Sequence, residues 1–223
     1  MIMSYTIQKE GPLTIIDDFL EPADFEYTRD YFMGREIPSA VPGEAPYSEQ
    51  MIRWDWVGSV VDTDELGLDD DLDDYQLVNM VWDTTGPTAA AGYVASTLSH
   101  PLVNVASVVK IKANLNPRTK NVLVHGFHTD VPFDCMTAIL YINTNNGYTI
   151  FDNGYKVESV ENRFLMFPSQ LKHSGSTCTN AKRRVVINFN YFTATLGGKE
   201  LNKGEDPTNT GFRTVQDLGY STL

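Results

Sequence analysis

The chain has 223 residues, of which 42% are hydrophobic, and it carries a formal net charge of −12 at pH 7. This length and this share of hydrophobic residues are typical of one globular domain with a sizeable core. The acidic balance argues against a nucleic-acid partner held through its phosphates, because such binding needs clustered Lys and Arg that the chain lacks.

Neither a membrane segment nor a disulfide framework is predicted. No segment approaches the roughly 18 to 20 consecutive apolar residues of a membrane-spanning helix, and the N-terminal sequence does not join a basic region to an apolar one as a secretory signal does. The two cysteines, Cys135 and Cys178, are expected to be small buried hydrophobic residues. We expect a cytoplasmic protein without membrane contact, and the sequence leaves its oligomeric state open.

The N-terminal part is predicted to combine a strand, a helix and a loop. Leu13 to Phe19 has the composition of a short strand. Glu21 to about Phe32 is predicted to form a helix, because Pro22 and acidic residues stand in its first turn. Gly34 to Pro46 contains three prolines and two glycines and is expected to be a loop. Met51 to Val61 is rich in β-forming residues and is expected to be an extended arm of a sheet.

An acidic segment and a second helix are predicted next. Asp62 to Asp74 holds eight acidic residues in thirteen, so repulsion between them should keep the segment solvated, and its spacing is not that of a calcium-binding EF-hand loop. Leu77 to Trp82 is predicted to be a strand, and Pro87 to Leu98 a helix that one glycine weakens. His100 directly precedes a proline and is expected to be a boundary residue without chemistry.

From Ala106 to Phe192 the pattern changes to closely spaced strands. Seven short segments without helices between them indicate an antiparallel sandwich or barrel and not βαβ units. Their sequences are SVVKIKANL, VLVHGFH, MTAILYIN, NTNNGYTIF (which includes a turn), YKVES, RFLMFP and RRVVINFNYF. We expect one domain over residues 1–195, in which residues 1–105 elaborate a barrel core at 106–195, followed by a loosely packed tail at 196–223.

The sequence HGFHTD places His128 and Asp130 two residues apart, between flanks that look extended. Residues two apart on a strand point to the same face, so both side chains could reach one metal ion. His173 supplies a third candidate ligand. Two imidazoles and one carboxylate form the set that leaves three adjacent positions open on non-haem Fe(II). The alternative is a surface histidine beside a solvated aspartate, with His173 exposed in the loop QLKHSGS.

The last predicted strand, RVVINFNYF, has two different faces. One face is apolar and the other is more polar; the first consists of Val185, Ile187, Phe189 and Tyr191, and the second of Arg184, Val186, Asn188 and Asn190. This alternation fits a barrel that encloses a ligand. On the interior face Arg184 could hold a carboxylate with two parallel hydrogen bonds, whereas Arg183 has the opposite parity and is expected to turn outward.

These motifs resemble those of the Fe(II)- and 2-oxoglutarate-dependent oxygenases, specifically their prolyl 4-hydroxylase-like branch. The resemblance covers about Val109 to Phe192, and LTIIDDFLEP near the N-terminus is similar to the start of the same branch. It implies that His128, Asp130 and His173 bind Fe(II). It also implies that Arg184, which precedes a strand of the form RVVINF, binds the far carboxylate of 2-oxoglutarate.

Two further segments extend the resemblance. Tyr141, in the segment YIN, is implied to help hold the 2-oxoglutarate carboxylate. The turn NNGYTIF is similar to the family's Gly-Gly-x-Thr-x-Phe element, with Asn146 in place of the first glycine. His125 lies three positions before His128, which puts it on the opposite side of an extended strand and favours a structural contact over a hydrogen bond to the metal ligands. The motifs are also similar to those of uncharacterised members encoded by bacterial viruses.

The resemblance implies a mainly β fold, a double-stranded β-helix (a jelly-roll or cupin-like barrel) with the N-terminal helices packed on one sheet. It implies a dioxygenase reaction in which 2-oxoglutarate chelates Fe(II), dioxygen converts it to succinate and carbon dioxide, and a C–H bond of the substrate is hydroxylated. Ascorbate is left open as a further cofactor. The substrate is not specified, because members of this branch act on prolyl and other protein side chains and on small molecules.

Two other functions stay open. The same three residues could hold Zn²⁺ for hydrolysis, although a hydrolase has no general need for Arg184 as a carboxylate clamp. The barrel could also be a non-catalytic binding module, which purified protein without bound iron would favour.

Overall fold

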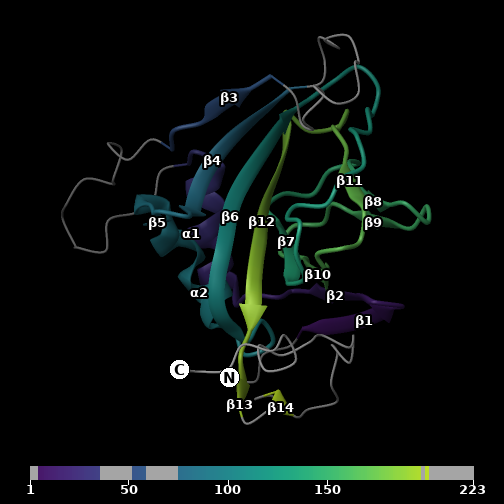
Figure 1. The fold of residues 1–223 in the computed structure, drawn as a ribbon. Coiled ribbons are helices and arrows are strands. Elements are labelled where there is room, and N and C mark those ends of the chain that lie inside the picture. Colours follow the sequence, from purple (N-terminus) through teal and green to yellow (C-terminus); the bar gives the residue numbers. More distant parts are fainter. Residues whose placement is uncertain (1–4, 36–51, 59–74, 197–198, 201–223) are drawn as a thin grey trace, which may run out of the picture.

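The computed structural model describes residues 5–35, 52–58, 75–196 and 199–200. This part of the chain is mostly β, as predicted, and consists of a nine-stranded antiparallel sheet and a separate three-stranded sheet (Figure 1). The helices lie on the face of the large sheet that is turned away from the small one (Figure 1). None of the helices in these described ranges is long and apolar enough to cross a membrane.

The large sheet has the strand order β1-β2-β10-β7-β12-β6-β4-β3, with β5 paired to β4. Its strands are β1 (Thr6–Glu10), β2 (Leu13–Asp17), β3 (Asp55–Val57), β4 (Gln76–Asp83), β5 (Gly86–Pro87), β6 (Val105–Pro117), β7 (Met136–Tyr141), β10 (Phe164–Pro168) and β12 (Arg183–Thr193). The two long strands β6 and β12 pair along their whole length and form the centre of the sheet. Their register places Arg184 opposite Asn116 and Asn188 opposite Lys112.

The small sheet has the order β11-β8-β9, formed by β11 (His173–Gly175), β8 (Tyr148–Phe151) and β9 (Lys156–Glu158). Isolated bridges extend it by joining Val124 to Ser176 and His128 to His173. Between β6 and β12 the chain passes back and forth between the two sheets, and all pairing within them is antiparallel. This alternation defines a double-stranded β-helix and confirms the fold predicted from the sequence. A separate two-stranded sheet joins β13 (Thr195–Leu196) and β14 (Lys199–Glu200).

The two faces of the large sheet bury separate hydrophobic clusters, because side chains alternate along each strand. On the outer face, Val185, Ile187, Phe189 and Tyr191 of β12 pack in one cluster with residues of the helices, including Phe25, Phe32 and Val94. The inner face contributes Ile139, Tyr141 and Val186 to a second cluster that includes Phe151 and Val157 of the small sheet. The predicted division of β12 into an outer apolar face and an inner face is therefore confirmed.

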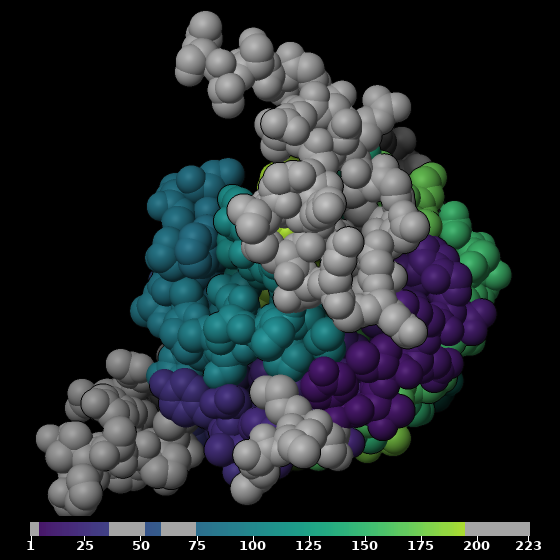
Figure 2. Space-filling view, turned by 90° about the horizontal axis from the view of Figure 1, so that it is seen from below, coloured from purple at the N-terminus to yellow at the C-terminus, as the bar shows by residue number. Residues whose placement is uncertain are grey.

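The predicted first helix is confirmed as α1 (Pro22–Phe32), whereas the single helix predicted over Pro87 to Leu98 is wrong. This segment forms a 3₁₀ helix, η1 (Ala89–Val94), and a short α2 (Ala95–Ser99). Tyr93 stacks on Tyr31 of α1 at 3.7 Å, and its carbonyl accepts a hydrogen bond of 2.7 Å from the Thr28 hydroxyl. Packing on α1 thus overrides the local preference for one continuous helix. Figure 2 shows residues of the N-terminal segment (purple) in contact with teal residues.

Other predicted elements differ in part from the structure. VLVHGFH is not a continuous strand, since only Val124 and His128 make bridges. β1 was not predicted, and its five residues are all exposed. Of the predicted arm at residues 51–61, the structure shows β3. The acidic segment 62–74, most of the predicted loop 34–46 and nearly all of the tail lie outside the described residues.

Gly147, directly before β8, is packed so closely that a side chain would not fit. A Cβ atom there would lie 2.7 Å from Arg184 Cδ, 2.7 Å from the carbonyl oxygen of Thr177 and 2.8 Å from Asn145 Oδ1. We therefore expect Gly147→Ala to lower the free energy of unfolding by about 1 to 3 kcal/mol. Gly92→Ala is the matched control, because a Cβ there meets nothing within 4 Å and alanine favours a helix. Urea denaturation of both variants measures the effect, and equal stability would contradict it.

Candidate metal centre

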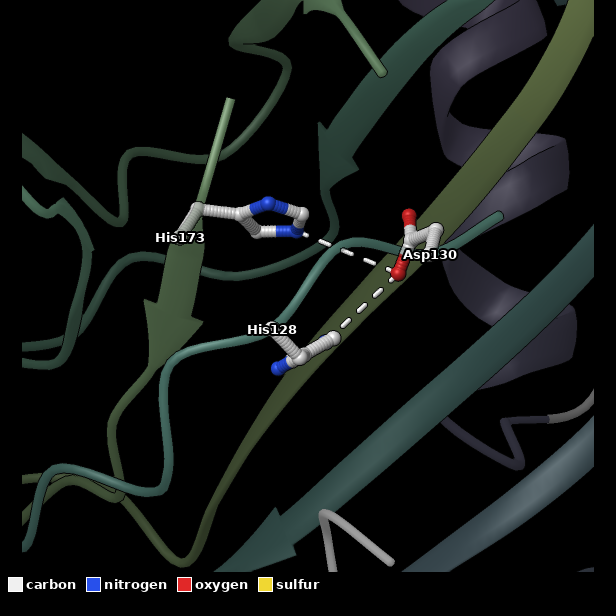
Figure 3. Close-up of side chains that lie close together, drawn as sticks. All are labelled: His128, Asp130 and His173. Carbon is white, nitrogen blue, oxygen red and sulfur yellow. Dashed lines mark ion pairs between the residues drawn. The ribbon is translucent and has the colours of Figure 1, made fainter. Parts of the chain in front are cut away.

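The side chains of His128, Asp130 and His173 meet at one point between the two sheets (Figure 3). His128 and His173 face each other across a bridge in which each backbone N–H donates to the other residue's carbonyl at 3.0 Å. Asp130 Oδ1 lies 3.6 Å from His128 Nε2 and 3.9 Å from His173 Nε2. The potential ligand atoms of the three residues all lie within 4.8 Å of one another, close enough to contact one metal ion.

Hydrogen bonds to the backbone orient both imidazole rings. His128 Nδ1 lies 3.1 Å from the carbonyl oxygen of Gly126, and His173 Nδ1 lies 3.1 Å from that of Leu171. When Nδ1 donates its proton to a carbonyl, the neutral ring keeps its lone pair on Nε2. Both Nε2 atoms therefore present a lone pair toward Asp130. His173 Nε2 is buried and has no hydrogen-bond partner among the described residues, a cost that a metal ion at this point would remove.

The protonation states also suit metal binding. Burial acts to raise the pKa of Asp130, but the contact with His128 and the charges of His173 and Lys110 outweigh it and hold this pKa well below its usual range. Burial lowers the pKa of His173, against the opposing influence of Asp130. Burial also acts to lower the pKa of His128, but the neighbouring Asp130 carboxylate raises it overall. At neutral pH the site therefore offers an ionised carboxylate and a neutral His173.

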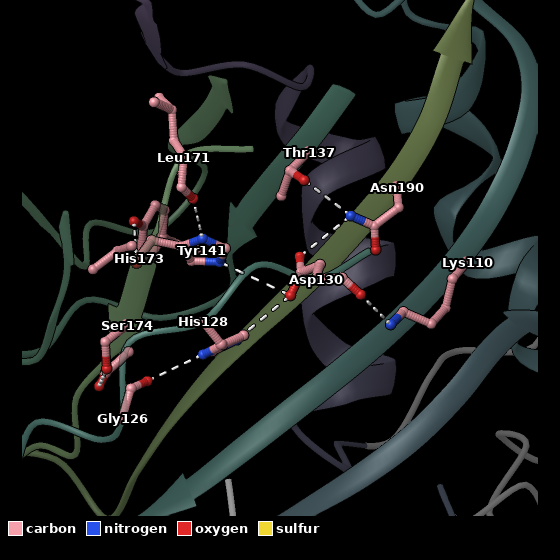
Figure 4. Close-up of polar contacts among 12 residues, drawn as sticks. Lys110, Gly126, His128, Asp130, Thr137, Tyr141, Leu171, His173, Ser174 and Asn190 are labelled. Atoms are coloured by element: carbon pink, nitrogen blue, oxygen red, sulfur yellow. Dashed lines mark hydrogen bonds and ion pairs between the residues drawn. The ribbon is translucent and has the colours of Figure 1, made fainter. Parts of the chain in front are cut away.

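Residues of the large sheet form hydrogen bonds that position Asp130 (Figure 4). Asn190 Nδ2 donates to Asp130 Oδ2 at 3.3 Å and to the Thr137 hydroxyl at 3.0 Å. Lys110 Nζ donates to the backbone carbonyl of Asp130 at 3.3 Å. Asn190 thus holds the carboxylate of Asp130 and Lys110 holds its backbone. Both contacts matter because Asp130 lies in an irregular segment after the bridge, where no strand ladder positions it.

Arg184 lies in the same pocket as the three potential ligands, and it is 2% exposed. Its Nε donates to the Ser159 hydroxyl at 2.8 Å, and its Nη2 donates to the Thr149 hydroxyl at 3.2 Å. No carboxylate pairs with it among the described residues. Burial lowers its pKa, yet a guanidinium stays charged in proteins. Within the described residues this cation is buried without a counter-ion, which is costly unless an anion binds beside it.

Tyr141, the other residue expected beside 2-oxoglutarate, does not line the pocket itself but contacts a residue that does. Its hydroxyl donates to the Thr149 hydroxyl at 2.8 Å, and Thr149 lines the pocket in its place. Thr149 is the threonine of the NNGYTIF segment, but no role beside Arg184 was predicted for it or for Ser159, which directly follows β9. Hydroxyl residues are frequent, and nothing in the local sequence marks Ser159.

The predicted position of His125 is wrong. It lines the pocket together with His128, where the alternation of a regular strand would place it on the opposite side. The reason is that residues 125–127 form no ladder, so the alternation does not hold. Asn116 Nδ2 lies 3.3 Å from His125 Nε2, and the Ser174 hydroxyl donates to the His125 carbonyl at 2.8 Å.

The cysteines are not part of this centre. Cys135 and Cys178 are both buried and free, and neither belongs to the group of potential ligands. We expect the double variant Cys135→Ser, Cys178→Ser to lose stability, because it buries two hydroxyls, while it keeps wild-type affinity for Mn(II). Calorimetric Mn(II) titration of the folded variant is the measurement. Loss of metal binding would mean that a thiolate belongs to the ligand set, which would favour zinc.

Comparison with protein-family models and with curated proteins finds no match. Solved structures with a similar arrangement include a Trichoplax adhaerens prolyl hydroxylase in complex with a peptide fragment of the hypoxia inducible factor oxygen degradation domain (16% identity, TM-score 0.48, 81% of this chain and 83% of that chain covered). A Pseudomonas putida prolyl-4-hydroxylase is similar at 14% identity and TM-score 0.43, over 81% of this chain and 92% of its own. An oxidoreductase of the 2OG-Fe(II) oxygenase family from Burkholderia pseudomallei is similar at 10% identity and TM-score 0.41, over 56% of this chain and 72% of its own.

Proposed function

We propose that the protein is an Fe(II)- and 2-oxoglutarate-dependent dioxygenase that hydroxylates a C–H bond of its substrate. The observation that carries this proposal is the buried Arg184 guanidinium, which has no carboxylate partner in the described part of the chain and lies in one pocket with His128, Asp130 and His173. Such a pocket offers ligands for a metal ion and, in Arg184, a cation that can bind an anion. A 2-oxo acid with a second carboxylate satisfies both.

The three ligand residues fit Fe(II). Two imidazoles and one carboxylate form the set found in non-haem iron oxygenases, and it leaves adjacent positions for a cosubstrate and dioxygen. His128 and His173 would bind through Nε2, and Asp130 through its carboxylate. The buried and unpartnered Nε2 of His173 supports this assignment, since a structural histidine at 2% exposure normally finds a hydrogen-bond partner.

The protein's own residues would bind and orient the cosubstrate. Arg184 would hold the far carboxylate with its remaining N–H groups, and the Thr149 hydroxyl would assist, itself positioned by Tyr141. The metal with 2-oxoglutarate and dioxygen supplies the oxidation. Arg184 and His173 are both 2% exposed, and this burial would keep water from the cosubstrate and strengthen each charged contact.

Zinc-dependent hydrolysis uses similar ligands and is the alternative. It leaves the uncompensated Arg184 without a role, and so does a non-catalytic binding module without a bound anion. The substrate, whether a prolyl or other protein side chain or a small molecule, stays a prediction, as do the cytoplasmic location and the similarity to members encoded by bacterial viruses.

The direct test of the two-part pocket is calorimetry on protein loaded with Mn(II), which replaces Fe(II) without supporting turnover. We expect 2-oxoglutarate to bind only when the metal is present. Glutarate is the matched control, because it keeps both carboxylates but lacks the 2-oxo group that chelates, and it should bind at least tenfold more weakly. Equal binding of 2-oxoglutarate to metal-free and Mn(II)-loaded protein, or no binding to either, would overturn the proposal.

A further inference from the structure

Lys112 is a second cation in the pocket, and the proposed function does not use it. It lies on the inner face of β6, and it lines the pocket with the candidate metal ligands. Its neighbours across the sheet are uncharged: Asn188 on β12 and Met80 on β4. In the described residues its ammonium group has no hydrogen bond and no ion pair. Lys110, two residues earlier, donates instead to the Asp130 carbonyl.

The surroundings of Lys112 add polar groups that also lack partners. The side-chain oxygens of Asn114 and Asn188 are buried without a hydrogen bond from any residue that the structure describes, and both residues line the pocket. Asn114 is 7% exposed. An amide oxygen buried without a partner costs about 1 to 3 kcal/mol, and native proteins keep few such groups unless something binds them. Lys112, Asn114 and Asn188 therefore bring to the pocket an ammonium and two amide oxygens that lack partners in the described part of the chain.

Charge balance indicates that this ligand is not 2-oxoglutarate. A divalent metal, the Asp130 carboxylate, a 2-oxoglutarate dianion and the Arg184 guanidinium together cancel. Lys112 then remains as an uncompensated positive charge. Burial and the charge of Lys110 lower the pKa of Lys112, and the opposing influence of Asp130 is smaller. Asp130 thus lies near enough to influence Lys112 but does not pair with it. A further anion would complete the pocket.

We propose that Lys112, with Asn114 and Asn188, forms a substrate subsite that binds a carboxylate on the molecule to be hydroxylated. This inference rests on the proposed function and names the class of its substrate. The carboxylate would neutralise Lys112, and the amides would bind polar groups next to it. Because this subsite and the three candidate metal ligands line the same pocket, a compact acid bound there would present its carbon chain to the metal centre.

The test measures binding near the metal without turnover. Protein loaded with Mn(II) and saturated with 2-oxoglutarate is titrated with propionate, and paramagnetic relaxation of the propionate protons by Mn(II) reports its approach. Propionamide is the matched probe, since it has nearly the same shape without the charge. We expect propionate to be relaxed and propionamide to bind at least tenfold more weakly. Lys112→Met should weaken propionate at least tenfold, equivalent to about 1.4 kcal/mol.

Two control variants keep the result interpretable. Lys112→Arg retains the positive charge and should retain the preference for propionate over propionamide. Lys120→Met removes an exposed lysine outside the pocket and should bind propionate as the wild type does. Circular dichroism establishes that each variant is folded. A blocked glutamate, N-acetyl-glutamate α-methylamide, distinguishes the source of the carboxylate: its binding would indicate an acidic side chain, and binding of propionate alone a free acid.

The outcomes separate this inference from the proposed function. If Mn(II) or 2-oxoglutarate fails to bind, the proposed function fails, and the subsite falls with it. If both bind but neither carboxylate probe is relaxed by Mn(II), or if Lys112→Met binds them as tightly as the wild type, the subsite is overturned and the proposed function stands. Equal binding of propionate and propionamide would likewise overturn it.

Discussion

Alanine in place of His128, Asp130 or His173 is expected to abolish Fe(II)-dependent turnover of 2-oxoglutarate and to leave the fold intact. Each substitution removes one of the three candidate ligands that the described residues bring together. Loss of a residue that merely supports a ligand typically costs 10- to 100-fold in metal affinity, so we expect loss of a ligand itself to cost more than about 100-fold. Asp130→Ala should have the largest effect, because it also removes the only carboxylate of the group.

Calorimetric titration of Mn(II) into each variant is the measurement. His125→Ala is the matched control, because it removes a third pocket histidine that lies outside the group of potential ligands, and its metal affinity should be unchanged. Wild-type affinity in any of the three ligand variants would exclude that residue from the centre. A loss in His125→Ala as large as theirs would show that the ligand set is incorrectly assigned.

Arg184→Ala is expected to weaken 2-oxoglutarate binding by about 30-fold or more while metal binding survives. Truncating one partner of a buried, hydrogen-bonded charge pair costs about 2 to 5 kcal/mol, and each 1.4 kcal/mol is a factor of ten. Arg184→Lys should recover only part of this loss, because a lysine keeps the charge but not the planar fork that reaches Ser159 and Thr149.

The neighbouring Arg183 is the internal control for this prediction. It lies on the opposite face of β12, and its guanidinium donates to the backbone carbonyl of Met33. Arg183→Ala should reduce stability, because that carbonyl loses its donor, and should change the affinity for 2-oxoglutarate little. A titration of 2-oxoglutarate into both Mn(II)-loaded variants is decisive. If Arg183→Ala were the more damaging substitution, the assignment of the carboxylate site to the inner face of β12 would be incorrect.

Strand parity is the reason that much of this site could be predicted from the sequence. In β12 every second residue from Val185 to Tyr191 is apolar and buried on the helix side, so Arg184 had to lie on the inner face. His173 was expected as a third ligand, and the structure shows it in β11 at 2% exposure, not exposed in a loop. The position of Arg184 follows from local alternation, which a single sequence records.

Other features depend on contacts that a single sequence does not record. His125 entered the pocket because residues 125–127 form no ladder, and η1 formed because Tyr93 packs on α1. Lys112 was missed for a different reason. In SVVKIKANL, lysine and asparagine alternate with apolar residues as they do on a solvent-exposed strand face. Only the small sheet opposite turns that face into the wall of a pocket.

The most direct test of the proposed function is to incubate the wild-type protein with Fe(II), 2-oxoglutarate and dioxygen and to measure succinate against oxygen consumed. Because the substrate is not specified, excess enzyme and long incubation are used so that slow turnover can be measured, with His173→Ala as the blank. We predict succinate formed in equal amount to the oxygen consumed, with Fe(II) but not with Zn(II). If protein that has bound both Fe(II) and 2-oxoglutarate forms no succinate above the His173→Ala blank, the result would contradict a dioxygenase. The barrel would then be a binding module.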